Sequence, residues 1–161
     1  MKITIDWQTP IQLTQNQKLL FDENEIPEEI KSSPAVYYFS RSHGDRLIPF
    51  YIGETLSVRA RLKSHLQTVK IVDVLFGRLG DHQIKNGRRF FHYGYLTGNP
   101  SRETAKKRLI IVQRLMIQIA VEGEIAMLNK SLTKIPTHNI VFAGSAVGRG
   151  EYEKNHAIVS R

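Results

Sequence analysis

The sequence contains no cysteine. This absence excludes a disulfide framework, a thiolate nucleophile and a zinc site with cysteine ligands. No run of apolar residues is long enough to span a bilayer. Residues 1–7 also lack the apolar stretch and the small-residue cleavage site of a secretory signal. We therefore expect a cytoplasmic protein that does not associate with membranes.

Acidic residues are few relative to basic ones. The chain carries 15 Asp and Glu against 23 Lys and Arg, a formal net charge of +8. Residues 55–90 hold eight Lys and Arg against two Asp, whereas residues 1–33 hold six acidic residues against three lysines. A polyanion bound to the middle of the chain would gain from counterion release. Solvated helix faces are the alternative interpretation of the same pattern.

A chain of 161 residues is long enough for one domain with a real core and short for two. We expect one domain overall, in which residues 1–33 form an N-terminal extension on the core, residues 34–139 the central unit and residues 140–161 a C-terminal strand or tail. The pattern predicts an α+β fold with a small, mainly antiparallel sheet flanked by helices. The expected elements are a strand at 2–7, a hairpin at 35–40 and 48–53, helices at 55–66 and 68–80, a strand at 89–96, a helix at 102–130 and a strand at 140–142.

Four polar side chains are expected to meet where the hairpin joins the next helix. Tyr37 and Tyr51 lie on the two predicted strands, and Arg61 and His65 are four residues apart, so both project from one helix face. A tyrosine has an unperturbed pKa near 10, so it needs nearby cations to act as a base. An arginine binds a phosphate through two parallel hydrogen bonds. The cluster therefore suits phosphate chemistry, although strand tyrosines are more often packing residues.

The runs Pro-Ala-Val-Tyr at 34–37 and Tyr-Ile-Gly at 51–53, followed by Arg61 and His65, resemble the GIY-YIG nuclease domain. The resemblance covers about residues 34–139. The second run is the more specific, because Ala35 replaces the usual glycine of the first. The resemblance implies a metal-dependent endonuclease that hydrolyses phosphodiester bonds in DNA. It further implies that Tyr37 is the general base, that His65 assists it and that Tyr51 orients water or phosphate.

The resemblance also implies a metal-binding glutamate in a later helix and an asparagine beyond it. Glu124 fits this place better than Glu122, because apolar Met127 and Leu128 follow it at the family's offsets. A single Mg²⁺ or Mn²⁺ on Glu124 is the implied cofactor. A solvent-facing helix carboxylate is the alternative interpretation of this residue. The asparagine is assigned to Asn139, with Asn129 as a rival.

Basic residues near the cluster are expected to contact DNA phosphates without reading bases. The expected partner is DNA; RNA as substrate and assembly into a homodimer stay open. Two further functions stay open as well, a catalytically weak or inactive nucleic-acid-binding module on the same fold and an RNA-cleaving toxin or defence nuclease. The residues assigned to nucleic-acid binding are Arg59, Lys63, Arg88, Arg89, Lys106 and Lys107.

Overall fold

The computed structural model describes residues 1–75, 87–123 and 138–158. Within these residues seven strands form one sheet in the order β6-β5-β7-β1-β8-β9, with β2 beside β7, and β3 and β4 form a separate pair. The strands are β1 (Lys2–Trp7), β2 (Ile11–Gln12), β3 (Thr14–Gln15), β4 (Lys18–Leu19), β5 (Ala35–His43), β6 (Arg46–Thr55), β7 (Arg89–Leu96), β8 (His138–Gly144) and β9 (Asn155–Ile158). The helices are α1 (Val58–Leu66), α2 (Val69–Leu75), α3 (Arg102–Glu122) and α4 (Ala146–Arg149).

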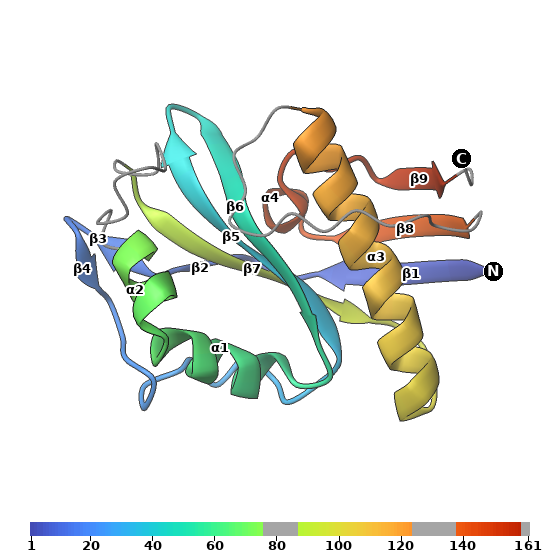
Figure 1. The fold of residues 1–161 in the computed structure, drawn as a ribbon, viewed down its shortest axis with the longest axis horizontal. Helices are drawn as coiled ribbons and strands as arrows, with labels where there is room; N and C mark the ends of the chain where they lie inside the picture. The colour runs from blue at the N-terminus through green and yellow to red at the C-terminus, as the bar shows by residue number, and fades with distance from the viewer. Residues whose placement is uncertain (76–86, 124–137, 159–161) are drawn as a thin grey trace.

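The α+β class is confirmed, but the predicted sheet was wrong in its size and pairing. Besides the antiparallel β5, β6 and β7, the sheet contains β1, which pairs antiparallel with β7 and parallel with β8. The sequence predicted a small antiparallel sheet because hairpin signals are local, whereas β1 and β8 lie more than 130 residues apart along the chain. The segments assigned to an N-terminal extension and a C-terminal tail supply β1, β8 and β9 (Figure 1).

The β5–β6 hairpin is longer than predicted. Its strands stay paired to His43 and Arg46, so the turn consists of Gly44 and Asp45. Gly44 has a φ of 60°, a conformation that glycine adopts without steric penalty. In the strand order β6 is the outermost strand, and a free edge accommodates a residue without an N–H such as Pro49.

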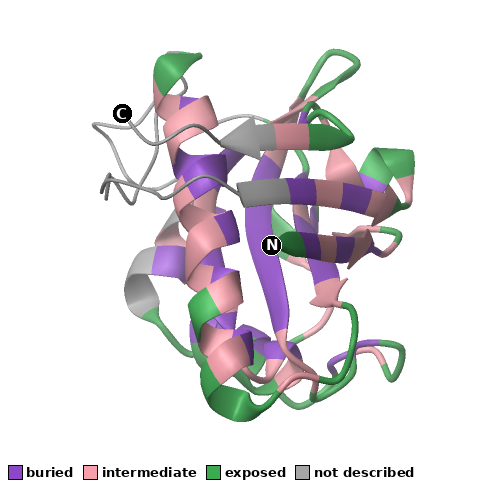
Figure 2. Cartoon of the chain, turned by 90° about the vertical axis from the view of Figure 1, so that its right-hand side faces the viewer, coloured by how far each residue is buried: buried purple, intermediate pink, exposed green. Residues whose placement is uncertain are grey.

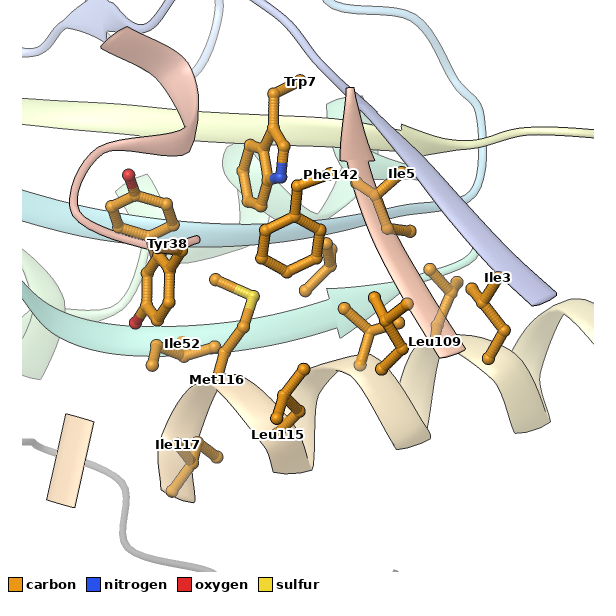
Figure 3. Packing of buried hydrophobic residues seen from close by; sticks show 14 of the residues in the cluster. Ile3, Ile5, Trp7, Tyr38, Ile52, Leu109, Leu115, Met116, Ile117 and Phe142 are labelled. Atoms are coloured by element: carbon orange, nitrogen blue, oxygen red, sulfur yellow. The ribbon is translucent and has the colours of Figure 1, made fainter. Parts of the chain in front are cut away.

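Strand β5 is buried on both faces. Tyr37 and Phe39 face a core built with α1 and α2, whereas Val36 and Tyr38 face a core built with α3. Figure 1 shows the hairpin running between α1 and α2 on one side and α3 on the other. In Figure 2 buried positions recur along α3, and exposed ones mark its ends. Figure 3 shows Trp7, Tyr38, Ile52 and Phe142 packed against Leu109 and Met116 of α3.

Buried hydrogen bonds hold helix α4 against the sheet. The Tyr38 hydroxyl and the His92 Nδ1–H both donate to the Gly148 carbonyl, each at 2.8 Å, and Ser40 Oγ donates to His92 Nε2 at 2.7 Å. A Cβ at Gly148 would lie 2.0 Å from the Gln8 carbonyl oxygen, so glycine is required there. The glycine-rich sequence of residues 144–150 predicts a flexible tail or a substrate-contacting loop. That prediction was wrong, because this segment packs on the core.

Among the described helices, none combines the length and the apolar character that crossing a membrane requires.

We expect folding stability to fall as the pH drops from about 6.5 to about 4. Burial lowers the pKa of His92 to about 4, whereas in the unfolded chain its pKa is near 6.5. The unfolded state therefore binds the proton more readily, and the stabilisation present above pH 6.5 is lost as the pH approaches 4, on the order of 3 kcal/mol in total. Urea unfolding at a series of pH values measures this fall. Burial lowers the pKa of His65 to about 4 as well, so this residue adds to the fall in the same pH range. His92→Gln should therefore make the fall shallower without abolishing it, and an equally steep fall in that variant would contradict the assignment.

Candidate functional site

Strands β5 and β6 and helix α1 bring three aromatic side chains together. The Tyr37 hydroxyl lies 2.6 Å from His65 Nε2. The ring centroids of Tyr37 and Tyr51 are 6.4 Å apart, and those of Tyr51 and His65 are 5.2 Å apart. Tyr37 and His65 are buried, and Tyr51 is half-buried. We call Tyr37, Tyr51 and His65 the aromatic cluster.

Gly53 makes room for the Tyr37 ring. It is the residue opposite Tyr37 in the β5–β6 pairing. A Cβ at this position would lie 2.3 Å from both Cζ and Oη of Tyr37. The tyrosine can therefore lie across the β6 backbone only because residue 53 has no side chain. This contact gives the Tyr-Ile-Gly run a physical meaning that does not depend on any family resemblance.

Helix α1 carries His65 into the core and leaves Arg61 at the surface. The Ser57 hydroxyl caps the helix by accepting a hydrogen bond from the Ala60 N–H at 3.4 Å. Leu62 and His65 are on the buried side of the helix, whereas Arg61 is exposed. The guanidinium charge still acts on the cluster. It partly offsets the rise that burial causes in the pKa of Tyr37, and it adds to the lowering that burial causes in the pKa of His65.

Both hydrogen-bonded partners of the cluster are uncharged at neutral pH. Burial is the largest cause of a Tyr37 pKa raised well above its usual value, and Tyr51 adds to the effect. Burial, followed by the charge of Arg61, lowers the pKa of His65 to about 4. In the tautomer protonated at Nδ1, His65 Nε2 accepts the hydrogen bond from the Tyr37 hydroxyl. The contact is therefore a hydrogen bond between a neutral phenol donor and a neutral imidazole acceptor.

An open pocket of about 380 Å³ lies at the start of α1. Two cationic side chains, Arg61 from α1 and Lys106 from α3, contribute to its wall. Its polar hydroxyls come from residues around the N-terminal half of α1. The full lining consists of Thr55, Leu56, Ser57, Ala60, Arg61, Ser64 and Lys106.

An ion pair that sequence reasoning missed borders this pocket. Lys106 Nζ lies 2.6 Å from Oε1 of Glu54, whose side chain is only 12% exposed. The other carboxylate oxygen of Glu54 is buried and has no hydrogen-bond partner. The sequence predicts that Glu54 serves the dipole of α1 and that Lys106 contacts DNA. The position of Glu54 directly after Gly53 could have indicated that this carboxylate lies near the cluster. The position of Lys106 could not have been predicted, because it depends on the long-range packing of α3 on β6.

The residues at the pocket do not fit a divalent cation. Among the described residues that line it are two cationic side chains and no carboxylate, and the neighbouring carboxylate of Glu54 contacts Lys106. Within the described ranges no group of three or more His, Asp or Glu side chains is placed to hold a metal ion. Glu124, the predicted metal ligand, and Asn129 lie outside the described residues.

The strand order separates Asn139 from the aromatic cluster. Asn139 belongs to β8, where its backbone is paired with Lys2 of β1. Strands β7 and β1 lie between β8 and β5. Three strand spacings correspond to about 14 Å across the sheet. The structure therefore does not bring the backbone of this residue to Tyr37.

Two of the six predicted nucleic-acid contacts hold the protein's own backbone instead. The Arg59 guanidinium donates to the carbonyls of Ile26, Pro27 and Ile30 at 2.9–3.1 Å. Arg89 is 1% exposed, and its Nη1 donates to the Gly87 carbonyl at 2.5 Å. Both guanidinium groups are thus used inside the fold, which charge alone does not show. Of the other four, Lys63, Arg88 and Lys107 are exposed, and Lys106 borders the pocket.

No protein-family model, curated protein or solved structure gives a significant match to this chain. The resemblance to GIY-YIG nucleases therefore stays a prediction that rests on the residues and on their geometry.

We expect Gly53→Ala to displace Tyr37 and to break its contact with His65. The added methyl group would overlap the tyrosine ring, and overpacking of this kind typically costs about 1–3 kcal/mol. The nitrogen chemical shifts of the His65 ring report the loss of the hydrogen bond, and thermal unfolding reports the cost in stability. Gly94→Ala is the matched control, because its Cβ would press on Ile5 and Trp7 away from the cluster. Unchanged His65 shifts in the Gly53 variant would contradict the role given to this glycine.

Proposed function

We propose that this protein is an endonuclease that hydrolyses phosphodiester bonds in DNA. The observation that carries the proposal is the 2.6 Å contact between the Tyr37 hydroxyl and His65 Nε2, next to a residue, Arg61, that lines an open pocket. A buried tyrosine needs a hydrogen-bond acceptor, and a backbone carbonyl would satisfy it. A neutral imidazole is an acceptor that can also take the proton away. This difference favours a catalytic over a purely structural pair.

The proposed reaction uses the pair as a proton relay. Water attacks the phosphorus atom and gives its proton to the Tyr37 oxygen, while the Tyr37 proton moves to His65 Nε2. The bond between phosphorus and the leaving sugar oxygen breaks, and that oxygen takes a proton from solvent. Arg61 binds the non-bridging phosphate oxygens through parallel hydrogen bonds and stabilises the charge that develops on them. Tyr51 is placed beside the pair to orient the water.

DNA is the proposed substrate because exposed positive charge surrounds this corner of the molecule. Lys63 lies in the last turn of α1, and Lys107 follows Lys106 on α3. Side chains of this kind contact phosphates and position a duplex without reading its bases. Dependence on Mg²⁺ or Mn²⁺ held by Glu124 stays a prediction from the family resemblance, and no step described above uses it.

A nucleic-acid-binding module without cleavage is the second candidate. The 1% exposure of Tyr37 favours it, because a general base has to reach water. A cleavage assay on plasmid, single-stranded and branched DNA and on RNA separates the two functions. Binding without cleavage of any of these substrates would favour the nucleic-acid-binding module. Cleavage of RNA alone would favour the RNA-cleaving toxin or defence nuclease.

We expect Tyr37→Phe to lower DNA cleavage by about 10²- to 10⁴-fold, the usual contribution of a general base. DNA affinity, measured by fluorescence anisotropy, should stay the same because the hydroxyl is buried. Tyr38→Phe is the matched control. It removes the hydroxyl of the next residue, which points to the opposite core and donates to Gly148. Full cleavage activity in Tyr37→Phe would show that Tyr37 is not the general base.

We expect the acid limb of kcat/KM for cleavage to lie near pH 4 rather than near 6.5. His65 has to be neutral to accept the Tyr37 proton, and burial lowers its pKa to about 4. Activity should therefore be complete above pH 6 and decline only as the pH falls through about 4. Rates measured within the pH range in which the protein stays folded test this limb. A decline centred near pH 6.5 would show that a solvated histidine governs the rate.

A further inference from the structure

The Glu54–Lys106 ion pair lies at the pocket in which the proposed reaction needs a cation. We propose that Lys106, together with Arg61, binds the phosphodiester in the pocket and takes the place of a divalent metal ion, so that cleavage does not require metal. This inference rests on the proposed nuclease function. It identifies Lys106 as the second positive charge, beside Arg61, that binds the phosphodiester.

The geometry directs Lys106 into the same pocket as Arg61. Lys106 lies in the second turn of α3, and its partner Glu54 directly follows Gly53, the residue that supports the Tyr37 ring. The charge of Glu54 also acts on Tyr37, because it raises the pKa of that residue. The carboxylate held by Lys106 is thus close to the proposed base, and the lysine side chain, which is 45% exposed, lines the pocket.

Glu54 fixes the ammonium group without using all of its donors. A carboxylate that is 12% exposed is costly to leave unpaired, so the contact between Glu54 and Lys106 is costly to break. An ammonium group has three N–H donors, and the contact with Glu54 Oε1 occupies one of them. The remaining donors are available to phosphate oxygens that enter the pocket.

The pocket's charge and its oxygen atoms favour a phosphodiester over a divalent cation. Arg61 and Lys106 against Glu54 leave one net positive charge, which complements the single negative charge of a phosphodiester. Mg²⁺ requires several oxygen ligands in an octahedral arrangement. The Thr55 hydroxyl is already bonded to the Ser57 carbonyl and N–H, and the Ser57 hydroxyl to the Ala60 N–H. A metal ion at Glu54 would therefore have only the second, buried carboxylate oxygen of that residue as an unpartnered ligand, and it would lie close to Lys106, whose charge repels it.

The experiment compares cleavage in excess EDTA with cleavage in Mg²⁺ for the full chain and three variants. The wild type should cleave in EDTA within about threefold of its rate in Mg²⁺. Lys106→Met should lose at least 100-fold in EDTA, comparable to removing one donor that stabilises transition-state charge. Arg102→Met is the matched control, because it removes an exposed positive charge of the same helix at a position to which no role in binding or catalysis is assigned. It should cleave at the wild-type rate.

Glu54→Gln shows whether the cation at the phosphodiester is Lys106 or a metal ion bound to Glu54. If Lys106 is the cation, this variant keeps cleavage in EDTA within about tenfold, because the lysine charge is retained. If a metal ion on Glu54 were the cation, cleavage would be lost. The double variant with Glu54→Gln and Lys106→Met removes both buried partners together. It should fold as judged by thermal unfolding and still fail to cleave, which excludes misfolding as the reason for the loss in Lys106→Met.

Cleavage that EDTA abolishes and Mg²⁺ restores would overturn the proposal, as would an active Lys106→Met variant. A wild type that cleaves nothing in either buffer would instead contradict the nuclease function. DNA binding in EDTA then decides the remaining claim, because weakening by about tenfold in Lys106→Met but not in Arg102→Met supports Lys106 as the phosphate ligand. Equal binding by the two variants overturns it.

Discussion

The burial of β5 on both faces is the constraint on which the arrangement of this protein depends. Side chains of a strand alternate between faces, so two consecutive tyrosines must enter different cores. Tyr37 meets α1 and His65, and Tyr38 meets α4 through the Gly148 carbonyl. A one-residue shift in register would exchange the two tyrosines and dismantle both contacts. The glycine opposite Tyr37 and the bonds around His92 keep that register in place.

The site combines a neutral interior with a charged rim. Tyr37 and His65 are removed from water and uncharged, whereas Arg61 and Lys106 lie where the pocket opens. An anion at this rim would face two cations that are held by different helices. Glu54 lets the second cation approach the first, because the buried carboxylate offsets the repulsion between them.

Local patterns were sufficient for much of the fold. The alternation and turn signals predicted the hairpin, the bounds of β7 match those expected, and Ser101 marked the start of α3. The register that sets Gly53 opposite Tyr37 could not be predicted in this way, because it depends on the two-residue turn and on a bulge between Phe39 and Ser40. The parallel pairing of β1 with β8 could not be predicted in this way, because no local signal identifies a distant strand partner. The same limit applies to Lys106 and Glu54, and to Arg59, whose backbone carbonyl partners come from a loop nearly 30 residues earlier.

The place of β1 also has a consequence for how the chain reaches its native state. This strand precedes its two neighbours in the sheet, β7 and β8, by about 85 and 135 residues. Until β7 forms, the apolar residues of β1 have no sheet to join, and until β8 forms the second edge of β1 is unpaired and is a template for another chain. Contacts this distant in sequence slow folding. During synthesis the hairpin and α1 can therefore assemble early, whereas completion of the sheet and of the core beneath α3 has to wait for the last quarter of the polypeptide.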